Sequence, residues 1–148
     1  DGILNFNKKI MFGQGNDNTR AVEIGDFNSD GYKDIVTANI DEPNFIYFGD
    51  EFDSFDKHVI YDNSKSSSFS LAVNDFNGDG YLDIVVGNSP GSTKLYINVL
   101  NGKEWKENAL SKNNFRTYDI IDSDINNDGK VDVLEANTGE YNLYYINK

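Results

Sequence analysis

The sequence has no cysteine, a single histidine and no long apolar run. Without cysteine, disulfide bonds are excluded, so thiol usage indicates nothing about the redox compartment. No segment approaches the run of about 18 apolar residues that a transmembrane helix needs, and no membrane span is predicted. The chain does not open with a basic and then apolar signal segment, although a secreted protein whose leader has been removed would look the same.

Positive charge is also scarce, with 13 Lys and Arg against 25 Asp and Glu, a net charge of -12. Binding to a phosphate backbone needs a basic face, so a nucleic-acid partner is excluded. Aromatic residues make up 14% of the chain, which is too many for a disordered acidic segment. No stretch keeps a 3.6-residue apolar period, so the composition favours short strands joined by tight turns.

Catalytic patterns are missing as well. The one histidine, His58, falls on the polar side of a predicted outer strand, where a solvated side chain is expected. We find no Ser-His-Asp set and no glycine loop of the kind that holds phosphate. The sequence therefore predicts no catalytic residues and no enzyme.

A nine-residue acidic pattern, Asp-x-Asn-x-Asp-Gly-x-x-Asp, occurs three times. The copies begin at Asp26, Asp75 and Asp124, so their spacing is 49 residues in both intervals. The register extends beyond the pattern, since Tyr47 and Tyr96 also occupy one repeat position. A fixed period of this length indicates a repeat architecture. The 148 residues are predicted to form a single domain of three units: 1–49, 50–98 and 99–147.

Each unit contains four strand signals. The first alternates apolar and polar residues before the acidic pattern, and the second is a short apolar run such as Ile35–Val36, typical of a strand buried on both faces. The third carries aromatic residues, as at 45–48. The fourth alternates again and includes residues 4–12, with Leu4, Phe6, Ile10 and Phe12 on one side. Four strands per 40 to 50 residues predict an all-β fold, a β-propeller with three four-stranded blades per chain.

The acidic pattern has the chemistry of a calcium site. Calcium takes six to eight oxygen ligands, and side chains at positions one, three, five and nine can converge if the loop curls around the ion. The residue at position seven would add its main-chain carbonyl, and the glycine at position six is expected at positive φ. Three Ca²⁺ ions per chain are predicted, with these ligands: Asp26, Asn28, Asp30, Tyr32, Asp34; Asp75, Asn77, Asp79, Tyr81, Asp83; Asp124, Asn126, Asp128, Lys130, Asp132.

The same residue types also occur in EF-hand loops and in metal-free turns. An EF-hand needs a glutamate at position twelve and flanking helices, but that position holds Thr37, Val86 and Glu135 and the flanks are strand-like. A metal-free turn would use the same residue types. Three carboxylates in each loop would repel one another without a cation, which favours the metal. The nine loop aspartates also account for most of the net charge of -12.

At these residues the sequence resembles the FG-GAP/VCBS repeat family, the calcium-binding propeller blades of integrin α-subunit heads and of bacterial extracellular proteins. The acidic pattern followed by Asp-Ile-Val is the most specific part of the resemblance. It implies that each calcium loop links the first and second strands of a blade, on the face opposite the usual ligand face. The ions would then stabilise the blades and would not contact a ligand.

Three blades do not close a ring, since propellers usually have four to eight. The chain opens with a fourth-type strand and ends on a third-type strand, residues 143–147. A head-to-tail homodimer would give six blades if the first strand of each chain completed the third blade of the other. The alternative is that these residues are a piece of a longer propeller.

The loops between second and third strands predict the ligand-binding face. They are rich in amides and carboxylates, which suit sugar hydroxyls, and their repetition would add avidity. A lectin-like carbohydrate-binding module is predicted, with an extracellular protein-interaction or adhesion module as the alternative. Calcium loops of this kind stay filled where calcium is millimolar, which favours an extracellular or periplasmic location. The candidate ligand-binding residues are Asn39, Asp41, Asn88, Ser89, Asn137 and Glu140, the asparagines having turn capping as their alternative role.

Overall fold

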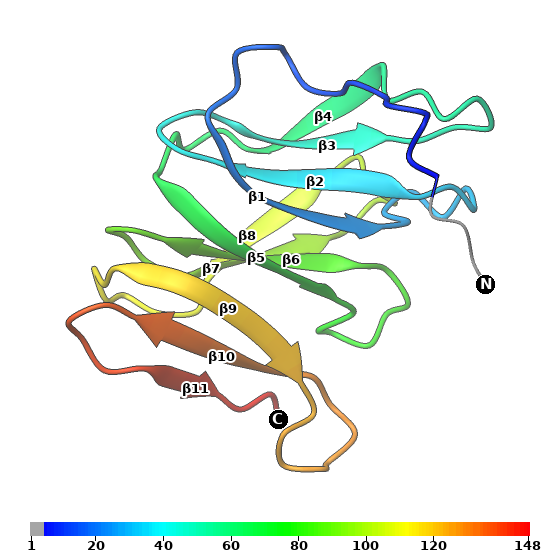
Figure 1. The fold of residues 1–148 in the computed structure, drawn as a ribbon. Helices are drawn as coiled ribbons and strands as arrows, with labels where there is room; N and C mark the ends of the chain where they lie inside the picture. The colour runs from blue at the N-terminus through cyan, green and yellow to red at the C-terminus, as the bar shows by residue number, and fades with distance from the viewer. Residues whose placement is uncertain (1–4) are drawn as a thin grey trace.

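The computed structural model describes residues 5–148, all of the chain except residues 1–4. The described residues contain eleven strands and no helix, arranged as three antiparallel sheets (Figure 1). The prediction of an all-β fold is therefore confirmed, and the sheets are of the propeller-blade type. Within the described residues, no helix is long and apolar enough to cross a membrane.

The sheets follow one another along the chain. The first contains β1 (Thr19–Gly25), β2 (Asp34–Asn39), β3 (Asn44–Phe48) and β4 (Lys57–Asp62). The second contains β5 (Ser68–Asn74), β6 (Asp83–Asn88), β7 (Lys94–Asn98) and β8 (Trp105–Ala109). The third contains β9 (Thr117–Ser123), β10 (Asp132–Asn137) and β11 (Leu143–Tyr145).

The third sheet has three described strands, so the prediction of four strands in every blade is wrong for that sheet. The predicted fourth-type strand at 4–12 is not formed either: residues 5–12 belong to no strand, and Leu4 lies outside the described residues. The two differences have one cause. A fourth-type strand pairs with the third strand of the preceding repeat, as β4 pairs with β3 and β8 with β7. Among the described residues, β3 already pairs with β4, so the segment 5–12 has no free third-strand edge beside it.

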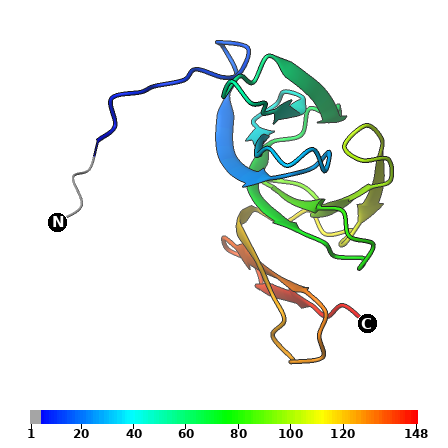
Figure 2. The same cartoon turned by 90° about the vertical axis from the view of Figure 1, so that its right-hand side faces the viewer.

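The three sheets pack face to face, with β1 on β5 and β5 on β9 (Figures 1 and 2). The first interface buries Phe27, Ile46 and Ile84 completely. The second buries Phe76 and Val133, which occupy the same repeat positions as Phe27 and Ile84. One packing scheme is therefore used twice. Apolar burial of this kind is the main favourable term in folding.

The single tryptophan, Trp105, packs among other aromatic rings. Its ring lies edge-on to Phe27, with centroids 6.0 Å apart, and also 6.0 Å from the ring of Tyr61. Its indole Nε1–H donates to the carbonyl oxygen of Gly102. The side chain thus packs at the interface between the first and second sheets.

Candidate functional site

The three acidic segments form matching loops between the first two strands of each sheet. They connect β1 to β2, β5 to β6 and β9 to β10. The aspartate at position nine is the first residue of the second strand, as Asp34 is in β2. The loop location predicted from the family resemblance is therefore confirmed.

The first aspartate of each loop holds the turn together. Both carboxylate oxygens of Asp26 accept backbone N–H groups, from Asp30 at 3.1 Å and from Gly31 at 3.0 Å. Asp75 and Asp124 accept the corresponding N–H groups in their own loops. Each loop thus curls around its first carboxylate.

Positions three and five meet inside the turn. The amide oxygen of Asn28 accepts from the N–H of Asp30, and its Nδ2 donates to Oδ2 of Asp30 at 2.8 Å. The same two contacts join Asn77 to Asp79 and Asn126 to Asp128. The side-chain oxygens of positions one, three and five therefore lie close together at the exposed turn of each loop.

The backbone conformation of the loops agrees with the expectation for position six. The φ angles of Gly31, Gly80 and Gly129 are 89°, 90° and 86°, as predicted. Position four is also left-handed, at Ser29 (56°), Gly78 (76°) and Asn127 (60°). That second feature was missed, although Asn and Gly tolerate this region best and occupy two of the three copies.

The aspartate at position nine is buried and has a different role. The two carboxylate oxygens of Asp83 accept N–H groups from Phe76, in its own loop, and from Asn98, at the end of β7. Burial raises the pKa of Asp83 to about 6, although the two N–H bonds oppose the shift. Burial raises the pKa of Asp34 for the same reason. These carboxylates anchor the loop to the sheet.

Asp132 is the exception in this series. Burial would raise its pKa, but the hydroxyl of Tyr144 and the N–H groups of Asn147 and Ile125 donate to it and lower the pKa overall. The tyrosine comes from β11, so the third sheet has an extra contact to its anchor. The carboxylate of Asp132 is therefore kept charged by more donors than its counterparts have.

Only the third acidic segment has the glutamate that an EF-hand requires at position twelve, and its carboxylate is hydrogen-bonded to residues outside the loop. Glu135, at position twelve of the third segment, is buried in β10 and accepts hydroxyl groups from Thr93, Thr117 and Tyr145. In residues 5–148, no group of three or more His, Cys, Asp or Glu side chains is gathered as a metal cluster. Each loop offers two kinds of oxygen ligand. Two carboxylates and one amide lie at its tip, and one carboxylate lies at its base. Calcium coordination by the fifteen named residues stays a prediction.

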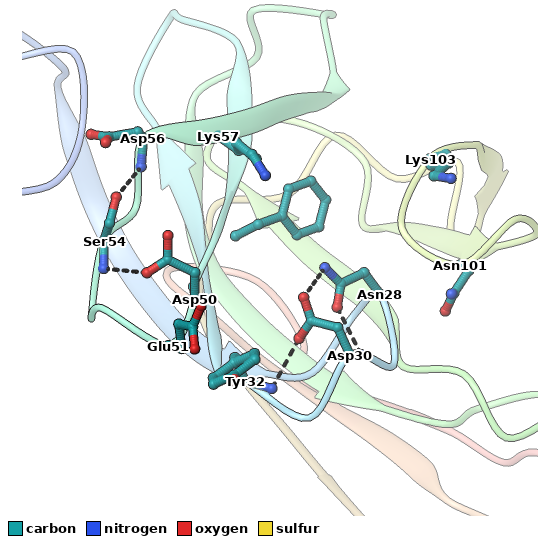
Figure 3. A pocket seen from close by; sticks show the side chains of 12 residues that line it. Asn28, Asp30, Tyr32, Asp50, Glu51, Ser54, Asp56, Lys57, Asn101 and Lys103 are labelled. Carbon is teal, nitrogen blue, oxygen red and sulfur yellow. Dashed lines mark hydrogen bonds between the residues drawn. The ribbon is translucent and has the colours of Figure 1, made fainter.

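A polar hollow of about 470 Å³ lies beside the first loop (Figure 3). Asn28 and Asp30 line one part of it, and Lys57 and Lys103 line another. The β3–β4 hairpin adds Asp50 and other polar residues to its wall. This hollow is on the side of the acidic loops, whereas the predicted ligand face is at the other end of the strands.

On the predicted ligand face, the asparagines cap the loops between the second and third strands. Nδ2 of Asn39 donates to the carbonyl oxygen of Pro43, and the same bond joins Asn88 to Ser92 and Asn137 to Tyr141. Asn39 and Asn88 are buried, so they act on loop shape. Asp41 and Glu140 are exposed and Ser89 is half-buried. Ligand binding by these six residues remains a prediction.

Two residues that connect neighbouring sheets were not identified from the sequence. The side chain of Asn98 donates to the carbonyl oxygen of Phe27 in the preceding sheet, at 2.9 Å. Asn147 makes the same bond to Phe76, at 2.7 Å. Their spacing of 49 residues, directly after the predicted third strands, was the available signal.

The sequence profile of the FG-GAP-like repeat family matches the chain twice, over residues 26–86 and 75–135. The chain belongs to the FG-GAP-like repeat family. Comparison with curated proteins gives no significant match. Each FG-GAP-like match begins at the first aspartate of an acidic loop and runs into the second strand of the following sheet. The family resemblance expected from the loops is therefore confirmed over the part of the chain that contains all three.

Because Asp83 is a buried anchor and Asp79 is exposed, the two aspartates should differ in their contribution to stability even without metal. In a chelating buffer, Asp83→Ala should lower the free energy of unfolding by about 2–5 kcal/mol, because two buried N–H groups lose their acceptor. Asp79→Ala removes an exposed carboxylate from the same loop and should cost about 1 kcal/mol or less. Urea unfolding followed by circular dichroism measures both. Equal losses in the two variants would contradict the anchoring role.

Proposed function

We propose that this chain is a calcium-stabilised, non-catalytic binding module that recognises carbohydrate outside the cell or in a periplasm. FG-GAP repeat proteins are typically extracellular and generally non-enzymatic. The observation that supports the proposal best is the repetition: three identical loop structures lie at one end of the sheets, and three identically capped loops lie at the other.

The residues of the acidic loops fit calcium by their donor chemistry. Every side chain at positions one, three, five and nine offers oxygen, which a hard cation prefers. The oxygens of positions one, three and five sit within one turn. The position-nine carboxylates keep lone pairs beyond the two N–H contacts of Asp34 and Asp83 and the three donors of Asp132. A bound ion would neutralise the like charges of each loop. The loops would hold one Ca²⁺ each, three per chain.

Calcium binding should therefore be stoichiometric and stabilising. Isothermal titration of the chelated protein should give three ions per chain, and Asp75→Ala should reduce this number to two. At calcium about 100-fold above Kd, each site adds about 2.7 kcal/mol to the free energy of unfolding, so the three sites together add about 8 kcal/mol and chelation should lower Tm by roughly 25 °C. An unchanged Tm and no heat of binding would overturn the calcium proposal.

Carbohydrate binding is supported by the exposed groups around the capped loops. The capping bonds of Asn39, Asn88 and Asn137 restrain each of the three loops, so their exposed polar groups are preorganised. Asp41 and Glu140 offer carboxylate acceptors for sugar hydroxyls. A protein partner on the same face is the second candidate, and it is favoured by the family, whose repeats occur in interaction modules.

A glycan array probed with the labelled protein tests this function. Binding to a defined set of glycans, competed by the free sugar, is expected. Combined Asp41→Ala and Glu140→Ala substitutions should weaken binding at least tenfold, while Glu51→Ala, on the opposite end of the first sheet, should leave it unchanged. Absence of glycan binding with retained capture of a purified extracellular protein would favour the second candidate.

We also propose that two copies close a six-bladed ring. On the outer face of the first sheet, Val22 is 50% exposed, whereas Leu71 and Ile120 at the same repeat position are buried. On the outer face of the third sheet, Ile125 is 40% exposed, whereas Phe27 and Phe76 are buried. These two faces correspond to the two sides of the interfaces already present in the chain. Exposed apolar surface of this kind marks a contact site.

The segment 5–12 would complete the third sheet of the second copy. Ile10 and Phe12 are both 41% exposed, while Val59 and Tyr61, their counterparts in β4, pack in the first interface. Figure 2 shows the segment leaving the first sheet and projecting away from it. The outer edge of β11 has no partner strand among the described residues. Pairing would satisfy the edge and bury both side chains.

The two existing pairings predict the register of the exchanged strand. Phe48 lies opposite Lys57, and Ile97 lies opposite Lys106. The same repeat positions would place Ile146 opposite Lys8 of the second copy. Because the chain has no cysteine, Lys8→Cys combined with Ile146→Cys should give a disulfide-linked dimer on oxidation.

Native mass spectrometry of the unmodified chain is the companion measurement, and it should show a species of twice 16.7 kDa. Lys8→Cys combined with Leu143→Cys is out of register and serves as the control. A dimer that cross-links equally well in both variants would refute the register. A monomer at all concentrations would refute the closed dimer, and the two exposed faces would then belong to a longer propeller.

A further inference from the structure

The innermost strand of each sheet contains a β-bulge at the same repeat position. The pairing of β1 with β2 shifts between Thr19 and Ala21, and that of β5 with β6 shifts between Ser68 and Ser70. In the third sheet the shift falls where Thr117 pairs with Asn137 and Asp119 pairs with Ala136. The extra residues lie 49 apart and are Arg20, Phe69 and Tyr118. A bulge changes the direction of its side chain and is common beside functional sites.

These three side chains form one continuous row across the three sheets, which we call the axial row. The guanidinium carbon of Arg20 lies 5.5 Å from the centroid of the Phe69 ring, a cation–π contact. The ring of Phe69 lies 5.4 Å from that of Tyr118, with 58° between their planes. Phe69 is half-buried between its two neighbours, and Tyr118 is 48% exposed. The row therefore ends in an accessible aromatic ring.

The axial row lines a polar hollow of about 490 Å³ on the innermost strands. Glu23 and Asp119 also line it, so cationic and anionic groups stand beside the two rings. Asp119 is fixed in place, because its Oδ1 accepts the hydroxyl of Ser70 and the N–H of Ile120. Aromatic rings with fixed hydrogen-bonding groups next to them are the usual components of a small-ligand site.

The row lies at the end of the strands that carries the capped loops. Thr19, next to Arg20, pairs with Asn39, and Ser68, next to Phe69, pairs with Asn88. The row thus opens on the predicted ligand face, away from the acidic loops. A hydrogen bond from Ser67 to Asp41 also links the chain segment before β5 to the first capped loop.

We propose that the axial row is the main sugar-contacting surface of the module. The apolar C–H face of a pyranose would lie on the ring of Tyr118, and its hydroxyls would bond to Arg20, Glu23 and Asp119. The sugar would be neutral, because two carboxylates face one guanidinium in the hollow and the whole chain carries -12. This inference rests on the proposed carbohydrate function and places its site on the innermost strands.

A panel of methyl glycosides of glucose, galactose and N-acetylglucosamine tests this placement. Saturation-transfer NMR identifies the glycoside that binds, and titration gives its Kd for each variant. Tyr118→Ala and Phe69→Leu should each weaken binding at least tenfold. Phe52→Ala removes a more exposed aromatic ring from the β3–β4 hairpin at the other end of the sheet and should leave Kd unchanged. Calcium stoichiometry and Tm of each variant report whether the fold is intact.

The outcomes separate the placement from the function. Glycoside binding that Tyr118→Ala leaves intact, while Asp41→Ala abolishes it, would overturn the axial site and retain the carbohydrate function. The absence of binding by the unmodified protein to every glycoside and glycan would overturn both. Loss of binding in Tyr118→Ala with unchanged calcium stoichiometry and Tm would support the axial site, because a residue that only packs the sheets would change stability.

Discussion

The buried carboxylate at the base of each acidic loop is the interaction on which the arrangement of the sheets depends. Asp83 accepts an N–H from its own loop and one from Asn98, and the side chain of Asn98 then donates to Phe27 in the preceding sheet. One charge thus connects a loop, the third strand of its sheet and the neighbouring sheet. A charge removed from water costs several kcal/mol unless it is hydrogen-bonded. The two N–H bonds from the loop and from the third strand offset this cost, and the side chain of Asn98 then couples both elements to the neighbouring sheet.

The same interaction explains how the first sheet differs from the other two. Gly49 stands where Asn98 and Asn147 stand in the later sheets, and its N–H still binds the buried carboxylate of Asp34. It has no side chain to reach a preceding sheet. A Cβ at this position would lie 2.2 Å from the carbonyl oxygen of Lys33, so the site is also closed to larger residues. A sheet packed in front of the first one would therefore be held by apolar contacts and strand pairing, without the amide bond.

Most of the fold could be predicted because each strand and turn pattern occurs three times in the chain, at the same repeat position. The apolar run at Ile84 and Val85 predicts a buried strand, and the glycine at position six predicts the positive φ that Gly80 adopts. The segment at 5–12 has the same apolar alternation as β4 but forms no strand. Strand formation depends on a partner edge, and that information does not lie in the segment itself.

The parts of the site that could not be predicted are those that depend on contacts between repeats. Alignment places Arg20, Phe69 and Tyr118 at one position, but three different residue types give no common chemical signal. Their row exists because the bulges direct three side chains to the same side of the innermost strands. The bond from Asn98 to Phe27 spans 71 residues and is likewise visible only after folding.

Between the repeats of this chain, the acidic-loop residues are nearly identical, whereas the residues of the axial row differ. This contrast has a physical reason. The loop residues repeat almost without change because each loop satisfies the same local demand, to close a turn around carboxylates. The axial residues differ because together they form one surface, in which a cation, a half-buried ring and an exposed ring stand side by side. Three identical residues would form three equivalent binding sites. Three different residues form one asymmetric site, which would bind its ligand in one orientation. Stability is thus built from what the repeats share, and selectivity would come from the positions at which they diverge.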